Sequence, residues 1–161
     1  MNKLGEIDLD EEDRNKIIYS YHSKNPYALA YLAEKSVAEF YIRNGFEVEQ
    51  PDSNGTRGAI DLIVKKCGEV IAIEIKSFSS QTVLFSMRNR LFSAVKQIER
   101  LIEQENIEQG KVIAVVRGDI DEVLTPQVKG VLNLVKDKVN PKITIDIGFV
   151  DIDDNFELID L

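Results

Sequence analysis

Two carboxylates and one ammonium group are predicted to share one face of a β-hairpin. A tight turn at residues 66–69 joins two runs that are rich in β-branched residues. This turn places Asp61 directly opposite Glu74, with their Cβ atoms about 5 Å apart. Lys76 follows Glu74 by two residues and therefore lies on the same face of the sheet. We expect the three side chains to form one charged cluster on an otherwise apolar hairpin.

Like charges directly opposite one another destabilise a sheet, so this cluster has a cost that a function would explain. Two carboxylates, together with backbone carbonyls and water, suit Mg²⁺. A nearby Lys can hold a water molecule or stabilise developing negative charge. These are the parts of a site for metal-assisted phosphodiester hydrolysis. The alternative is that Asp61 begins a strand at the solvent edge and that Glu74 and Lys76 are ordinary charges on an exposed face.

The elements that would position this cluster follow from apolar periodicity. After a short helix near 15–25 we expect a helix at 27–44 ended by Gly45, strands at 46–49, 59–65 and 70–75, a helix at 87–106, a strand at 111–117, a helix at 126–138 and a strand at 143–150, with an edge segment near 156–158. The order helix, three strands, helix, strand, helix, strand predicts an α/β fold in which helices flank a mixed central β-sheet.

Length and composition fit one domain, because 161 residues with 43% hydrophobic content can bury a core. One cysteine excludes an internal disulfide, and without a signal peptide it fits a cytoplasmic protein. No apolar run approaches the roughly 20 residues of a membrane span, so we expect no membrane association. We expect residues 1–13 to form an acidic tail and residues 14–161 to form the domain.

The net charge of −8 alone disfavours a nucleic-acid-binding protein, because phosphate contacts need Lys and Arg. Residues 1–13 hold six acids and one base, and residues 146–161 hold six acids and no base. The segment 14–145 carries 16 acids and 19 bases. The acidity is thus concentrated in the two ends, and binding of nucleic acid to the middle of the chain stays open.

The same residues carry a family resemblance. Asp61, followed at Glu74-Ile75-Lys76 by a Glu-x-Lys, resembles the Asp…Glu-x-Lys signature of the PD-(D/E)XK, or restriction-endonuclease-like, nuclease superfamily. The resemblance covers residues 27–105. It implies a restriction-endonuclease-like core for the predicted sheet.

Two further segments refine the resemblance. Glu34, eleven positions before the Gly of Gly-Phe-Glu-Val at 45–48, resembles the first-helix entry of archaeal-type Holliday junction resolvases. The segment 73–78 is similar to a small family of excision-controlling factors from cyanobacterial DNA elements, which share the nuclease-like core.

The resemblance implies a role for each residue of the cluster. Asp61 and Glu74 would be metal ligands, and the carbonyl of Ile75 would complete the inner shell. Lys76 would orient or activate the attacking water. Glu34 would reach the site from the first helix, directly or through water.

Two more side chains are candidates for this site. Glu39 is a weaker candidate than Glu34, because a spacing of five residues turns the two side chains toward different faces of the helix. Gln97 resembles the helix Gln that follows Glu-x-Lys in several branches of the superfamily. The alternative for Gln97 is a surface position on an amphipathic helix.

Basic residues beside the site are candidates for a phosphate track: Arg57, Arg88, Arg90, Lys96 and Arg100. Arg88 and Arg90 are the preferred DNA contacts. Lys96 and Arg100 have an equally simple explanation as one solvated face of a helix.

The resemblance implies a Mg²⁺-dependent endonuclease, with Mn²⁺ able to substitute, that hydrolyses DNA, with branched, recombination and repair DNA among the candidate substrates. Cleavage of two strands implies a homodimer. One alternative is a nuclease-fold binding or regulatory module in a larger complex, whose acidic ends would suit a protein partner. Another is an RNA or single-strand nuclease, but the few aromatic residues and the absence of Trp disfavour a stacking platform for single strands.

Overall fold

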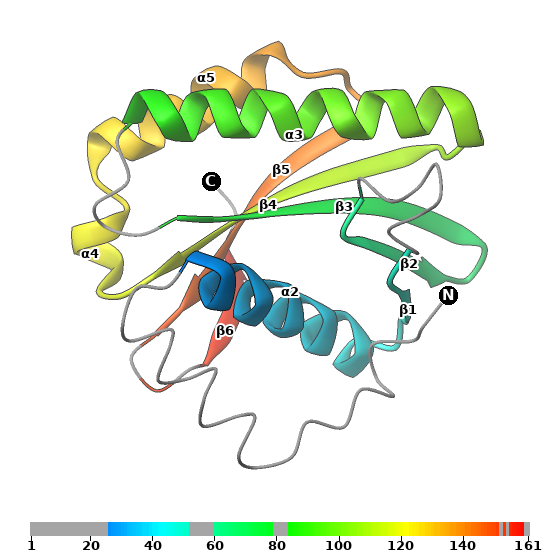
Figure 1. Ribbon diagram of the computed structural model, residues 1–161, viewed down its shortest axis with the longest axis horizontal. Helices are drawn as coiled ribbons and strands as arrows, with labels where there is room; N and C mark the ends of the chain where they lie inside the picture. The colour runs from blue at the N-terminus through cyan, green and yellow to red at the C-terminus, as the bar shows by residue number, and fades with distance from the viewer. Residues whose placement is uncertain (1–25, 52–59, 79–83, 152, 154, 160–161) are drawn as a thin grey trace.

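The computed structural model describes residues 26–51, 60–78, 84–151, 153 and 155–159. These residues form one six-stranded sheet in the order β1-β2-β3-β4-β5-β6, with helices on both faces (Figure 1). The elements are α2 (Pro26–Arg43), β1 (Glu47–Glu49), β2 (Leu62–Lys66), β3 (Glu69–Phe78), α3 (Leu84–Glu105), β4 (Gln109–Arg117), α4 (Ile120–Val123), α5 (Pro126–Lys138), β5 (Ile143–Val150) and β6 (Phe156–Ile159).

The sheet is mixed, and its topology decides which helix covers which face. Strands β1, β2 and β3 form an antiparallel meander, β3, β4 and β5 are parallel, and β6 returns antiparallel to β5. The two parallel crossovers advance in one direction, so right-handed connections place α3 and α5 on the same face. Helix α2 covers the other face, as Figure 1 shows.

The residues of β3 divide between the two faces because side chains alternate along a strand. Ile73 and Ile75 pack in the cluster beneath α2, whereas Ala72 and Phe78 pack in the larger cluster beneath α3 and α5. Glu74, between Ala72 and Phe78 in this alternation, therefore belongs to the α3 face. Lys76 shares that face.

The β2–β3 hairpin has the predicted register. Lys66 pairs with Glu69, and the ladder continues to Leu62 opposite Ile73. Both central residues of the turn have left-handed backbone, with φ of 50° at Cys67 and 82° at Gly68. Such a turn matches the twist of the two strands and fixes their pairing.

The end of α2 is also as predicted. Gly45 has φ of 85° and follows the helix. Its amide donates to the carbonyl of Ile42 at 3.0 Å, and the amide of Phe46 donates to the carbonyl of Tyr41 at 3.0 Å. This pair of bonds is a Schellman motif, which lets the chain turn directly into β1.

The predicted fold class is confirmed, with differences at the ends of elements. The strand expected at 59–65 begins at Leu62, and Asp61 lies in a bend before it. The predicted order omits α4, a four-residue helix after β4, while the expected edge segment is present as β6. The short helix near 15–25 and the acidic tail at 1–13 lie outside the described residues. No helix in the described part of the chain is long and apolar enough to cross a membrane.

Candidate active site

The candidate site lies where β3 extends beyond the end of its pairing with β2. Strand β2 pairs with β3 only as far as Ile73, so the stretch from Glu74 onward has no β2 partner. Asp61 takes up the place beside this open edge, and its Oδ2 accepts a hydrogen bond of 2.7 Å from the backbone amide of Ile75. The Asp61 carboxylate thus satisfies a strand amide that would otherwise lack a ladder partner.

Glu74 is buried at this edge, with 3% of its surface exposed. Its Oε1 forms an ion pair of 3.3 Å with Nζ of Lys76, which is itself only partly exposed. Its Oε2 is buried and finds no hydrogen-bond partner among the described residues. A buried carboxylate oxygen without a donor is costly, so this atom is a ready ligand for a cation.

Glu34 reaches the same place from α2. It lies close enough to Asp61 for hydrogen bonding and close enough to Lys76 to feel its charge. Asp61 is therefore the centre of three carboxylates, since it also interacts with Glu74. Glu39 is outside this group, as predicted: its side chain is 52% exposed and lies 3.8 Å from Nζ of Lys35.

The electrostatics of the cluster favour the protonated form of two of its carboxyl groups. Burial raises the pKa of Glu74 to about 8, and the negative charge of Asp61 adds to this increase. Burial likewise raises the pKa of Glu34 to about 8, again with a contribution from Asp61. The positive charge of Lys76 lowers the pKa of both groups, but by less than burial raises it. A buried carboxyl group beside the negative charge of Asp61 resists ionisation unless a cation offsets that charge.

The residues fit a hydrated Mg²⁺ better than an all-protein metal cage. No three His, Cys, Asp or Glu side chains in the described ranges are arranged to hold a metal ion by themselves. Mg²⁺ does not need such a cage, because it is usually bound by one or two carboxylates and keeps several water molecules. Asp61 and Oε2 of Glu74 would supply two such ligands.

Helix α3 carries Gln97 and Arg90 on one side. The two residues are seven apart, nearly two turns, so they lie on the same flank of the helix. The Gln97 side chain carries a buried Oε1 without a hydrogen-bond partner in the described structure. This burial argues against the alternative of an ordinary surface Gln.

Arg90 fixes the end of β3 to α3. Its Nη1 donates a hydrogen bond of 3.0 Å to the carbonyl of Ser77, and its guanidinium lies 4.6 Å from the centre of the Phe78 ring. Ser77 directly follows Lys76 in the sequence. Sequence reasoning placed Arg90 on a DNA track and missed this inward contact, although its spacing from Gln97 indicates that the two share a flank.

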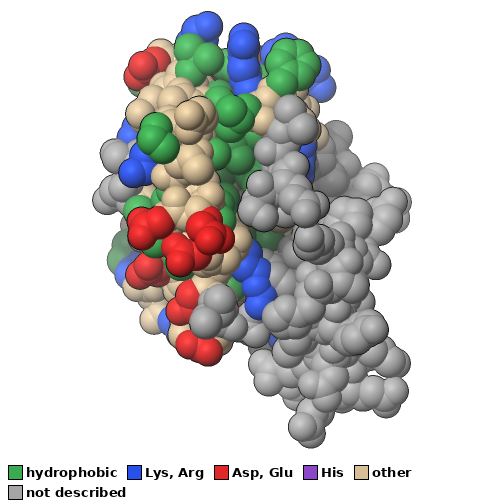
Figure 2. Space-filling model, turned by 90° about the vertical axis from the view of Figure 1, so that its left-hand side faces the viewer, with side chains coloured by type: hydrophobic (Ala, Val, Ile, Leu, Met, Phe, Trp, Pro, Cys, Tyr) green, Lys and Arg blue, Asp and Glu red, His purple; other side chains and the backbone are tan. Residues whose placement is uncertain are grey.

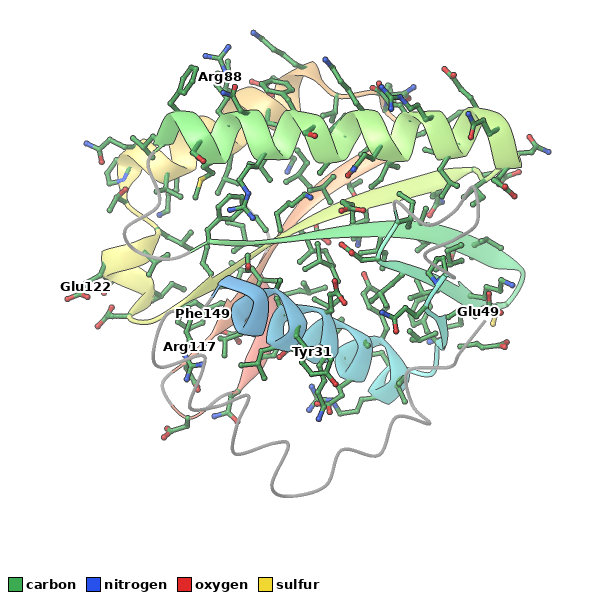
Figure 3. All side chains as sticks on the ribbon, in the orientation of Figure 1. Tyr31, Glu49, Arg88, Arg117, Glu122 and Phe149 are labelled. Atoms are coloured by element: carbon green, nitrogen blue, oxygen red, sulfur yellow. The ribbon has the colours of Figure 1, made fainter. Side chains whose placement is uncertain are left out.

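The other predicted DNA contacts lie on the exposed surface of α3 or outside the described residues. Arg88 and Lys96 are exposed on the outer side of α3, where Figure 3 shows Arg88 directed away from the sheet. Arg100 is exposed on the same helix. Arg57 lies outside the described residues.

Comparisons with known proteins support the fold. No family model matches the sequence, and no curated protein sequence matches it. The structure is similar to that of an XisH family protein from Nostoc punctiforme PCC 73102, with a TM-score of 0.51 and 12% identity over 80% of this chain and 99% of that chain. It also matches Pyrococcus furiosus SfsA in complex with Ca²⁺ at a TM-score of 0.40 and 8% identity, over 91% of this chain and 62% of that chain. The first likeness agrees with a restriction-endonuclease-like α/β core.

Proposed function

We propose that this chain is a Mg²⁺-dependent endonuclease that hydrolyses phosphodiester bonds of DNA. The observation that supports this most strongly is the buried oxygen of Glu74 that has no donor, beside the carboxylate of Asp61. A core position that leaves one carboxylate oxygen without a donor has no structural benefit, but it is what a cation site requires.

Asp61 and Glu74 would hold the metal ion, and the carbonyl of Ile75 would stand beside them. Bound Mg²⁺ would offset the carboxylate charge and withdraw electron density from the scissile phosphodiester. The hydrogen bond from the Ile75 amide holds the Asp61 carboxylate in place before any ligand arrives. A preorganised ligand set lowers the cost of forming the reactive geometry.

Lys76 would orient the attacking water and stabilise negative charge that develops on the phosphate. Its ammonium group is held by Glu74 at 3.3 Å, so it already stands at the site. The raised pKa of Glu34 favours its protonated form, and its carboxyl group would bind water at the site. Gln97 would donate or accept a hydrogen bond at the edge of the site facing α3.

The test is cleavage of labelled DNA with Mg²⁺ or Mn²⁺, on linear duplex, nicked duplex and a four-way junction. Wild type is compared with Glu74→Ala and Lys76→Ala. Glu39→Gln is the matched control, because Glu39 lies on the same helix as Glu34 but is exposed. We expect metal-dependent cutting by wild type and by the control, and a loss of at least about hundredfold in the other two variants. Absence of cutting by folded wild type on every substrate would refute the proposal.

A binding or regulatory module on the same fold is the second candidate, favoured by the net charge of −8. Metal binding separates the two, since a module without catalysis has no need of the metal. A module would bind no Mg²⁺ or Mn²⁺, or would bind it equally well after Asp61→Ala. For the nuclease we expect a homodimer, because one site cuts one strand.

A further inference from the structure

An aromatic and basic stripe runs along the outer side of α3. Phe85, Arg88, Phe92 and Lys96 follow one another at three- and four-residue steps, so they lie on one side of the helix. Phe85 is 68% exposed, the highest fraction among the large exposed hydrophobic residues of the described structure. We name these four residues the α3 stripe.

Two members of the α3 stripe, Arg88 and Phe92, contact one another. The guanidinium of Arg88 lies 5.9 Å from the centre of the Phe92 ring. Phe92 packs partly against the core beneath α3, so its ring supports Arg88 from a fixed position. Figure 3 shows that Arg88 is directed away from the sheet. The stripe therefore presents the Arg88 guanidinium and the exposed Phe85 ring to solvent. Because Arg88 already rests on Phe92, it would lose little side-chain entropy on binding a ligand.

The first part of α3 has no acidic residue, in a chain that is acidic overall. Between Lys76 and Ile98 there are three basic residues and no Asp or Glu, and the first acid after Lys96 is Glu99. The acids of this side gather instead at and just before α4, at Asp119, Asp121 and Glu122. Figure 2 shows a group of acidic side chains at the height of α4, with hydrophobic and basic side chains at the upper edge. The charge at the start of the stripe therefore favours an anionic partner.

The α3 stripe begins close to the candidate site along the helix axis but on another side of the helix. Phe85 lies five residues before Arg90, which is about 7.5 Å along the axis and about 140° around it. Arg90 contacts the carbonyl of Ser77, the residue after Lys76. A strand of nucleic acid that extends from the site around the start of α3 would reach Phe85 and Arg88.

We infer that the α3 stripe binds an unpaired segment of the DNA substrate, with a base stacked on Phe85 and phosphates paired with Arg88 and Lys96. This inference rests on the proposed function and names its substrate class: DNA with single-stranded character beside the cut. Phosphates of a regular duplex need only cations, whereas an isolated exposed aromatic ring matches the free face of an unpaired base. One ring serves one base, so the scarcity of aromatic residues in the chain is no obstacle.

The test is fluorescence anisotropy of labelled DNA with Ca²⁺ in place of Mg²⁺. A blunt duplex is compared with the same duplex carrying a short single-stranded extension. Wild type is measured beside Phe85→Ala, Phe85→Trp and Ile42→Ala. The last is the matched control, because Ile42 is an exposed apolar residue on α2, on the opposite face of the sheet. Phe85 is exposed, so its substitutions do not disturb the core.

We expect wild type to bind the extended duplex about tenfold more tightly than the blunt one. Phe85→Ala should lose most of this preference, while Phe85→Trp and Ile42→Ala keep it. Equal affinity of wild type for the two DNAs, or an unchanged preference in Phe85→Ala, would overturn the inference. A dimer that dissociates in Phe85→Ala would also overturn it, by assigning the α3 stripe to contacts between copies.

The two proposals fail separately in these measurements. Phe85-dependent binding without cleavage by folded wild type supports the α3 stripe and refutes the nuclease. Cleavage that requires Glu74, together with binding that is indifferent to Phe85, supports the nuclease and refutes the stripe.

Discussion

The carboxylate of Asp61 and the backbone amide of Ile75 are joined by a hydrogen bond of 2.7 Å across the end of the β2–β3 ladder. The bond gives Asp61 two roles. It completes the pairing of β3 where β2 has not yet begun, and it holds a negative charge beside Glu74. Stability depends on the hydrogen-bond acceptor of Asp61, whereas the proposed metal binding depends on its negative charge. Substitutions that remove one property and keep the other can separate the two roles.

Asp61→Asn and Asp61→Ala should differ in stability but not in activity. Asn keeps an oxygen that accepts from the Ile75 amide, whereas Ala leaves that amide without a partner. We expect Asp61→Ala to unfold in urea with about 1–2 kcal/mol less free energy than Asp61→Asn, both in EDTA. Both variants should lose metal-dependent cleavage. Equal stability of the two would show that the hydrogen bond contributes nothing.

The metal-free protein should become less stable as the pH rises from about 5 to about 8. The pKa values of Glu34 and Glu74 are raised in the folded chain to about 8, from an ordinary value of 4.5. Stability contributed by such groups is complete below their unfolded pKa and is lost as the pH rises through the folded one. Urea unfolding in EDTA across this range measures the effect.

The control for this pH dependence is Glu74→Gln, which removes one of the two titrating carboxyl groups. Its unfolding free energy should change less with pH than that of wild type. A wild-type profile that is flat or that rises between pH 5 and 8 would contradict the raised pKa values.

Gln97→Leu should separate function from stability. The buried Oε1 of Gln97 has no hydrogen-bond partner in the described structure, so an apolar side chain of similar size removes an unsatisfied group. We expect thermal stability to be unchanged or higher, with cleavage reduced about tenfold. Unchanged cleavage would mean that Gln97 has no part in the site.

Two glycines should respond in opposite ways to replacement by Ala. A Cβ at Gly110 would run into Cγ2 of Ile98, where α3 docks on the sheet, whereas a Cβ at Gly130 meets nothing within 4 Å. Gly110→Ala should lose about 1–3 kcal/mol of unfolding free energy, because α3 is pushed from the sheet. Gly130→Ala, on the exposed side of α5, should gain about 0.5–1 kcal/mol. Urea unfolding of both variants measures the difference, and a stable Gly110→Ala would contradict the close packing.

Much of the hairpin could be predicted because its geometry is local. The turn at 66–69 fixes the register of β2 against β3, and alternation then places Glu74 and Lys76 on one face. The start of β2 was predicted too early for a physical reason. Side chains of Asp compete with ladder hydrogen bonds for backbone amides, and Asp61 does so with Ile75.

The parts of the site that come from helices could be predicted only as candidates. The position of Glu34 beside Asp61 depends on how α2 packs across the sheet, and periodicity within α2 does not determine that. The inward contact of Arg90 with Ser77 likewise depends on the docking of α3. Helix α4 was missed because four residues carry no periodicity, although Asp119 caps it by accepting from the amide of Asp121 at 2.9 Å.

The most direct measurement of the central claim is a calorimetric titration with Mn²⁺ at pH 7 in two buffers of different ionisation enthalpy. If the carboxylates of Asp61 and Glu74 form a metal site whose carboxyl groups are protonated when metal-free, binding releases protons, and the heat depends on the buffer. We predict binding with proton release in wild type and in Glu39→Gln, and neither in Glu74→Gln. Absence of Mn²⁺ binding by wild type, or binding that persists unchanged in Glu74→Gln, would contradict the account.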